Sequence, residues 1–380
     1  MTLFDVPLDE LRTRTSQKWR RYPPDVLPLF VAEMDVRVCE PVVEAVADAV
    51  RRGDTGYVSG REYPEAFAAF AERRWGWSPD PGAAALVPDV MQGVAELVRL
   101  LTGPDGTVVV NPPVYPPFRA FVRRTGPRVE TADLRPDGRL DLAALEAAFT
   151  RARADGRSAA YLLCHPQNPT GTVHTPDELR AVGELAARHG VRVVSDEIHA
   201  PLVLDADTPF VSAVQVVEDA VALHSASKAF HLAGLKAALA VPGPGAAADL
   251  RRLPPTVLSE VAHVATIAQV AALTEGDAWL DALLDSLRDS RDHLRGLLGA
   301  RLPRTRWTPG AATYFAWLDL RDQLPGDDDP ADRILREARV ALNPGPSFGR
   351  PGAGFARLNF ATSRAVLTEA VERIAAALPA

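Results

Sequence analysis

The chain has 380 residues, of which 47% are hydrophobic and 24% are charged, and its formal net charge is −7. This length predicts two or three domains, and the composition is typical of a soluble globular protein rather than a fibre, a disordered chain or a basic nucleic-acid binder. The uncharged stretch of residues 261–274 is shorter than the about 20 residues that a membrane helix needs. We therefore expect neither a nucleic-acid partner nor a membrane partner.

The start of the chain and its cysteines bear on the compartment. The N-terminal residues lack the basic-then-apolar order of a secretory signal. Cys39 and Cys164 lie far apart and show no metal-ligand spacing, so we expect no disulfide and no metal site. These features together predict a cytoplasmic protein.

The middle of the chain alternates short apolar runs with amphipathic helical patterns. One helix is expected over residues 176–189, between an N-cap at Thr175 and a C-terminal stop at Gly190. Near-continuous apolar strands separated by helices predict an α/β fold with a mostly parallel sheet that helices cover on both faces. The expected strands are residues 108–110, 159–164, 191–195, 221–224 and 237–241.

The end of the chain has a different order, which predicts a smaller α+β domain. We expect a large domain over residues 41–275 and a small domain over 276–380, with the segment 1–40 packed against the small domain. The expected helices after residue 256 are 257–274, 277–299, 332–339 and 364–378, and the expected strands are 312–320 and 355–361.

Polar motifs follow four of the expected strands at their carboxyl ends. In open α/β sheets ligands bind outside these ends, so we expect the four motifs to converge on one site. The motifs are Asn111–Phe118, Cys164–Gly171, Ser195–His199 and His224–Lys228.

These motifs carry a resemblance to a known family. Ser225-Ala-Ser-Lys228, followed by Lys236, resembles the cofactor-lysine signature of fold-type-I pyridoxal-5′-phosphate (PLP) enzymes, and the motifs after the two preceding strands are similar to its companions. Within that superfamily the chain resembles the MalY/PatB cystathionine β-lyase (C–S lyase) group of the class I/II aminotransferases. Supporting matches are Lys18-Trp19, Pro28–Asp35, Gly56-Tyr57, Phe348-Gly349 and Arg357–Ala361. The resemblance implies the fold-type-I PLP-dependent transferase fold and a homodimer.

The resemblance also implies how the ring of PLP is held. Lys228 would bind the cofactor aldehyde and Asp196 would pair with the pyridinium nitrogen, which lets the ring accept electrons. Tyr115 would stack on the ring and join Lys228 and Asp196 as catalytic residues. Asn168 would donate to the ring hydroxylate, and His199 would contact the same oxygen.

The phosphate and the substrate need positive or N–H-bearing groups. We expect the turn at Gln92 to open a helix whose free N–H groups bind the phosphate, an arrangement that suits anions. By resemblance, Tyr57 would reach the phosphate across a dimer interface, and both Tyr57 and Val36 would approach the substrate. Arg357 would bind the substrate carboxylate with its guanidinium fork. The remaining phosphate residues are expected to be Ser225, Ser227, Lys236, Gly93, Val94 and Ala95.

The reaction is left open by these residues alone. Once an amino acid is bound, Lys228 can take its Cα proton, and either transamination or loss of a group from Cβ can follow. The resemblance favours a β-lyase acting on cystathionine or other cysteine S-conjugates; the alternatives are an aminotransferase and a PLP-fold module that senses a ligand or binds a partner without turnover. Four residues depart from the group pattern, namely Glu33, Val36, His165 and His231, and the last three bear on specificity.

Overall fold

The computed structural model of the chain describes residues 2–378. Seven strands in this range form one sheet with the order β2-β8-β7-β6-β5-β3-β4. Five neighbouring strands run parallel, namely β4, β3, β5, β6 and β7, whereas β8 is antiparallel to both β7 and β2. The expected mostly parallel sheet is therefore confirmed. The strands are β2 (Ala85–Val87), β3 (Thr107–Val110), β4 (Arg128–Thr131), β5 (Ala159–Cys164), β6 (Val191–Asp196), β7 (Val221–His224) and β8 (Ala238–Pro242).

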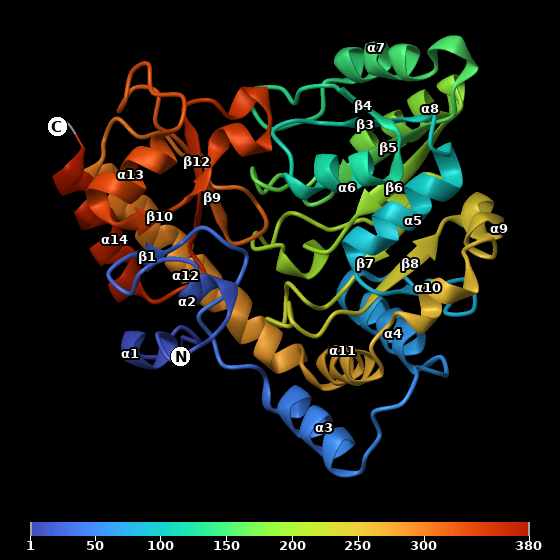
Figure 1. Cartoon of the computed structure of the whole chain (residues 1–380), viewed down its shortest axis with the longest axis horizontal. Coiled ribbons are helices and arrows are strands. Elements are labelled where there is room, and N and C mark those ends of the chain that lie inside the picture. The colour runs from blue at the N-terminus through green and yellow to red at the C-terminus, as the bar shows by residue number, and fades with distance from the viewer. Residues whose placement is uncertain (1, 379–380) are drawn as a thin grey trace.

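Helices cover both faces of this sheet because successive strand side chains point to opposite faces (Figure 1). On β5, Tyr161 and Leu163 pack in a cluster with α7 and α8. Leu162 and Cys164 pack in a second cluster with α5 and α6. Both faces of the strand are buried, which explains its continuous apolar run. The helices are α5 (Val90–Thr102), α6 (Pro117–Thr125), α7 (Leu142–Ala152) and α8 (Pro176–His189).

Helix α8 has the predicted bounds, because local residues mark both of its ends. Thr175 accepts from the backbone N–H of Glu178, and the Glu178 side chain accepts from the N–H of Thr175, which is a complete capping box. Gly190 ends the helix at a φ of +64°, a left-handed conformation that favours glycine.

The expected helix 257–274 is wrong, because it is two helices. Ala262 between them is extended and forms a β-bridge with Tyr57, which a residue inside a helix could not do. This bridge brings the loop of Tyr57 against the start of α11. The helices of this region are α3 (Glu40–Arg51), α4 (Glu62–Trp75), α9 (Ala247–Leu250), α10 (Pro255–Ser259), α11 (His263–Glu275) and α12 (Asp277–Arg301).

A second, antiparallel sheet has the order β11-β12-β9, and the N-terminal segment joins the elements around it. Strand β1 pairs parallel with β10, and Asn359 N–H donates to Leu29 O, so residues 27–29 lie against the C-terminal part of the chain. The domain bounds at 40 and 275 stay predictions, and residues 1, 379 and 380 lie outside the described chain. The elements are α1 (Leu8–Leu11), α2 (Gln17–Arg20), β1 (Leu27–Pro28), β9 (Phe315–Asp319), α13 (Pro330–Ala338), β10 (Val340–Ala341), β11 (Asn343–Pro344), β12 (Phe355–Asn359) and α14 (Arg364–Ala377).

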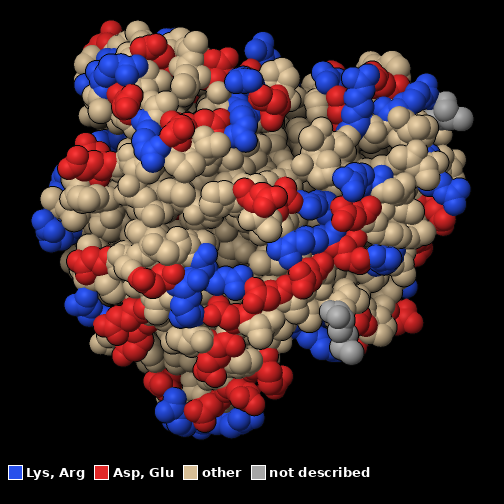
Figure 2. All heavy atoms as spheres, turned by 180° about the vertical axis from the view of Figure 1, so that it is seen from behind, with Lys and Arg blue, Asp and Glu red and all other residues tan. Residues whose placement is uncertain are grey.

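The surface carries charges of both signs. Figure 2 shows Lys and Arg beside Asp and Glu across one face of the molecule. Across residues 2–378, the structure contains no helix with the length and apolar character to cross a membrane.

Candidate active site

A cavity of about 260 Å³ lies at the carboxyl ends of the central strands, beside the start of α5. All four motifs that follow the expected strands contribute to its wall. Eight of the predicted site residues line it: Tyr115, Asn168, Asp196, His199, Ser225, Ser227, Lys228 and Lys236. The topology thus brings together side chains that are far apart in the sequence.

Asp196 and Lys228 are buried groups whose charged forms are disfavoured. Asp196 ends β6, and burial raises its pKa to about 7, although Ile198 N–H donates to Oδ1 (3.2 Å). Burial, together with the nearby Arg357, lowers the pKa of Lys228 to about 8. At neutral pH a larger fraction of Lys228 is therefore the unprotonated, nucleophilic amine than of a surface lysine. A cationic partner in the cavity would stabilise the ionised form of Asp196.

Arg357 projects from β12 and is held on several sides. Its Nη1 donates to Asn168 Oδ1 (2.9 Å) and its Nη2 to Phe30 O (3.0 Å), while the guanidinium stacks over Phe315 at 4.0 Å. Its Nε is buried and has no hydrogen-bond partner within residues 2–378. Burial lowers the pKa of Arg357 to about 10, so the group stays cationic at neutral pH and is suited to a carboxylate. The bond to Arg357 also fixes the Asn168 amide.

The anion-binding helix begins earlier than expected. Helix α5 starts at Val90, and its N-cap Asp89 accepts from the N–H of Gln92 (2.8 Å), so the prediction of a start at Gln92 was wrong. Gly93 N–H is already bonded to Asp89 O inside the helix, and a Cβ on Gly93 would come within 2.7 Å of the Leu223 side chain. Gly93, like the buried Val94 and Ala95 after it, therefore packs the helix on the sheet, and it is Asp89, Val90 and Met91 that line the cavity. The N-cap pattern of Asp89 was the signal for this start.

The other side chains expected to bind the phosphate, those of Ser225, Ser227 and Lys236, also line the cavity. Ser225 Oγ donates to Ala237 O (2.7 Å) and accepts from Ser227 N–H (3.2 Å), so it shapes the loop. The Ser227 hydroxyl has no hydrogen bond to any described residue. Lys236 Nζ lies 3.0 Å from Asp89 Oδ2, so its charge is balanced within the chain.

His199 lines the cavity, as expected, and its Nδ1 is buried without a partner among residues 2–378. Burial and the cations Lys228 and Arg357 hold its pKa well below the ordinary value, so the ring is a neutral imidazole. A neutral ring can donate one hydrogen bond and accept another, which suits a contact with a ring oxygen.

Six predicted site residues do not line this cavity: Gly93, Val94, Ala95, Arg357, Tyr57 and Val36. Tyr57 is 88% exposed on the surface, and Val36 is 1% exposed within the hydrophobic core. His165 and His231 also lie outside the wall. His165 stacks on Phe210 with ring centroids 5.0 Å apart, and His231 accepts from Met34 N–H at Nδ1 (3.2 Å).

The residues around the cavity fit the expected cofactor, PLP. Its aldehyde needs an amine, its ring nitrogen a carboxylate, its ring oxygen a donor and its phosphate free N–H groups. Lys228, Asp196, Asn168 and the first turn of α5 supply these groups around one cavity. The unpartnered His199 Nδ1 is a further sign that the site is built for a polar ligand.

Comparisons with known proteins agree with this donor set. The family model for aminotransferase class I and II matches residues 24–374. A Mycobacterium leprae protein with a provisional cystathionine β-lyase name is 50% identical over 394 residues, which covers 99% of this chain and 98% of its own. The cystathionine β-lyase of Corynebacterium glutamicum is 36% identical over 380 residues, which covers 98% of this chain and 99% of its own.

A solved structure shows the same fold over nearly the whole chain. It is a provisionally named PLP-dependent β-cystathionase from Corynebacterium diphtheriae, which superposes with a TM-score of 0.92 at 35% identity and covers 99% of this chain and 98% of its own. The chain therefore belongs to the class I and II aminotransferase family, has the fold-type-I architecture and is an enzyme with PLP as its cofactor.

Proposed function

We propose that the chain is a C–S β-lyase that catalyses α,β-elimination on cystathionine or related cysteine S-conjugates. The products are a thiol, pyruvate and ammonia. The observation that carries this proposal is the full-length similarity to cystathionine β-lyases. In this chain Lys228, Asp196 and Asn168 line one cavity, and Arg357 donates to Asn168. This similarity favours the lyase over the aminotransferase.

The side chains divide the work of the elimination. PLP, when bound, would supply an electrophilic carbonyl for the substrate amino group and an electron-withdrawing ring for the Cα atom. Arg357 binds the carboxylate through its guanidinium, and the Lys228 Nζ atom accepts the Cα proton. Asp196 would keep the ring nitrogen protonated, and Tyr115 would cover the ring face. The Cβ–S electrons leave with sulfur, which takes up a proton, and water converts the three-carbon remainder into pyruvate and ammonia.

We further propose that the enzyme is a homodimer with Tyr57 at the interface. Large apolar side chains are exposed at this end of the molecule: Val43 (45%) and Val50 (57%) on α3, Tyr57 (88%) and Leu258 (46%) on α10. Such side chains suit a contact with a second copy of the chain. In that assembly Tyr57 would reach the partner's phosphate site.

The two cysteines are free, which is consistent with a cytoplasmic enzyme.

A steady-state assay separates the lyase from its alternatives. The PLP-loaded protein should release pyruvate from cystathionine without an added keto acid. Amino transfer that depends on a keto acid, with no pyruvate released, would instead identify an aminotransferase. A protein that develops no visible PLP absorbance on adding the cofactor would refute both enzymatic functions.

A further inference from the structure

The segment Phe30–Asp35, called the 30–35 segment below, lies between the N-terminal strand β1 and helix α3 and contacts two cations of the site, Lys228 and Arg357. Phe30 O accepts from Arg357 Nη2 (3.0 Å). Ala32 O accepts from Lys228 Nζ (3.4 Å) and from the Tyr314 hydroxyl (3.3 Å), and Ala32 lines the cavity. Backbone carbonyls of this segment therefore form part of the active site.

The alternate carbonyls of the segment are held from outside the cavity. Asn359 Nδ2 donates to Val31 O (2.8 Å) and to Glu33 O (2.7 Å), so one amide brackets Ala32. Lys18 Nζ also donates to Glu33 O (3.2 Å). Asn359 lies two residues after Arg357 on β12, which ties the position of the segment to the strand that carries the carboxylate-binding group.

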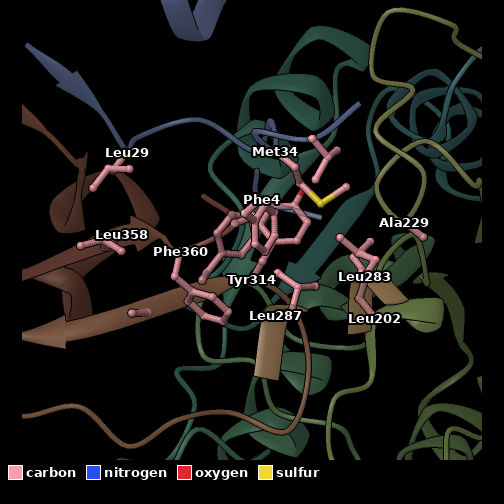
Figure 3. Close-up of a cluster of buried hydrophobic side chains, with 14 of the residues drawn as sticks. Phe4, Leu29, Met34, Leu202, Ala229, Leu283, Leu287, Tyr314, Leu358 and Phe360 are labelled. Carbon is pink, nitrogen blue, oxygen red and sulfur yellow. The ribbon is translucent and has the colours of Figure 1, made fainter. Parts of the chain in front are cut away.

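A buried ion pair fixes the far end of the segment. Lys18 Nζ lies 2.8 Å from Asp35 Oδ2, and both side chains are 1% exposed. Met34 N–H donates to His231 Nδ1, which connects the segment to the loop that follows Lys228. Figure 3 shows the side chains of Leu29 and Met34 within a buried hydrophobic cluster, so apolar contacts anchor both ends while polar contacts hold the middle.

We propose that Asn359 and Lys18 are positioning residues for the proposed lyase reaction: they hold the 30–35 segment closed over Lys228 and Arg357. Neither side chain lines the cavity, so each acts through the backbone of the segment. The expected effect on turnover rests on the proposed function. The closure, meaning the position of the 30–35 segment over Lys228 and Arg357, does not depend on that function.

Closure excludes water from the amine of Lys228. Burial is the largest cause of the lowered Lys228 pKa, so water admitted by an open segment moves that pKa upward toward its ordinary value. The charged groups that face Lys228 are Arg357 on β12, Glu33 of the segment, Asp196 on β6 and Lys236. Loss of the hydrogen bond to Ala32 O would lower the Lys228 pKa, because this carbonyl stabilises the charged amine. The bond is long (3.4 Å), so the effect of the admitted water is larger and the Lys228 pKa should rise.

The test uses two independent ways to release the segment. Asn359→Ala removes both amide donors. The double variant K18M/D35L removes the ion pair and the bond to Glu33 together, because removal of one buried charge alone would leave the other unpaired and is costly. The control is Ser290→Ala, which also removes a buried hydrogen bond to a backbone carbonyl (Ser290 Oγ to Thr362 O, 3.3 Å) but leaves the segment untouched.

Three measurements are compared for the intact chain. Hydrogen exchange of peptides covering residues 29–36 should become at least about tenfold faster in both release variants and stay unchanged in Ser290→Ala. The pH midpoint for PLP capture by the cofactor-free protein should rise by about one unit. The kcat on cystathionine should fall roughly ten- to a hundredfold.

The outcomes separate the two proposals. Wild-type exchange and an unchanged midpoint in both release variants would overturn the positioning role, even if their Tm falls as in the control. If Asn359→Ala does not fold, K18M/D35L decides the question. Wild-type protein that binds PLP but releases no pyruvate would refute the lyase function, while exchange and PLP capture would still test the closure.

Discussion

Replacing Asp196 by asparagine should stabilise the PLP-free enzyme while weakening its function. Burial raises the pKa of Asp196 from 3.8 to about 7. The folded protein therefore holds this proton more tightly than the unfolded chain. The stability that the bound proton contributes is fully present below about pH 4 and is lost as the pH rises toward 7. At about 1.4 kcal/mol per pKa unit, the ionised carboxylate costs up to about 4 kcal/mol at pH 8 and less than about 2 kcal/mol at pH 5.

An asparagine has no such pH dependence, and its amide oxygen can still accept from Ile198 N–H. The attraction between Asp196 and Lys228 is lost too, which makes these figures upper limits. With an unfolding entropy of about 2.1 cal/mol/K per residue, PLP-free Asp196→Asn should melt up to about 5 °C above wild type at pH 8 and about 2 °C above it at pH 5.

The assay is thermal unfolding of PLP-free protein at both pH values, with Glu197→Gln as a contrast. Glu197 is equally buried, but the nearby His224 (Nε2 to Glu197 Oε2, 3.2 Å) and His165 outweigh burial and lower its pKa, and Ser195 Oγ and Ala213 N–H donate to its Oε1. Removing its charge should therefore lower stability at pH 8, by roughly 2 kcal/mol or more. A Tm advantage of Asp196→Asn that is absent at pH 8, or is the same at pH 5, would show that the ionised Asp196 carboxylate does not destabilise the folded protein. Addition of PLP should reverse the order, because the variant has no carboxylate for the ring nitrogen.

Three further substitutions test the other ends of the site. Arg357→Lys should lower kcat/KM roughly a hundredfold, because a lysine lacks the planar fork; a substrate analogue without the α-carboxylate should show no such loss in steady-state kinetics. Tyr57→Phe should weaken PLP binding about tenfold in a fluorescence titration, and a wild-type Kd would argue against the phosphate contact across the dimer. Lys236→Met should also weaken PLP binding about tenfold, and unchanged affinity would mean that Asp89 fully neutralises this lysine.

The sequence was informative where local chemistry determines structure. The strand at 159–164 and helix α8 have their predicted bounds because an apolar run, a capping box and a left-handed glycine each act over a few residues. The motifs at strand ends were informative for a different reason: parallel strands place their carboxyl ends at one edge, so order along the chain predicts convergence in space.

The features that were missed depend on contacts between distant residues. The break before α11 follows from the bridge between Ala262 and Tyr57, and no local breaker marks it. Strands β2 and β4 are short and incompletely buried, so they lack a continuous apolar pattern. The carbonyl of Ala32 in the active site is invisible to motif reading, because its partners Lys228 and Tyr314 lie 196 and 282 residues away.

The role proposed for Lys228 is that of the base in a β-elimination in this cavity. Its most direct test is the product balance of the PLP-loaded enzyme with cystathionine as the only substrate, compared with Lys228→Ala. We predict that wild type forms thiol, pyruvate and ammonia in equal amounts and that the variant forms none of them above the background of free PLP. A wild-type enzyme that releases no pyruvate would not be a β-lyase, and a Lys228→Ala variant that retains wild-type turnover would show that Lys228 is not the base.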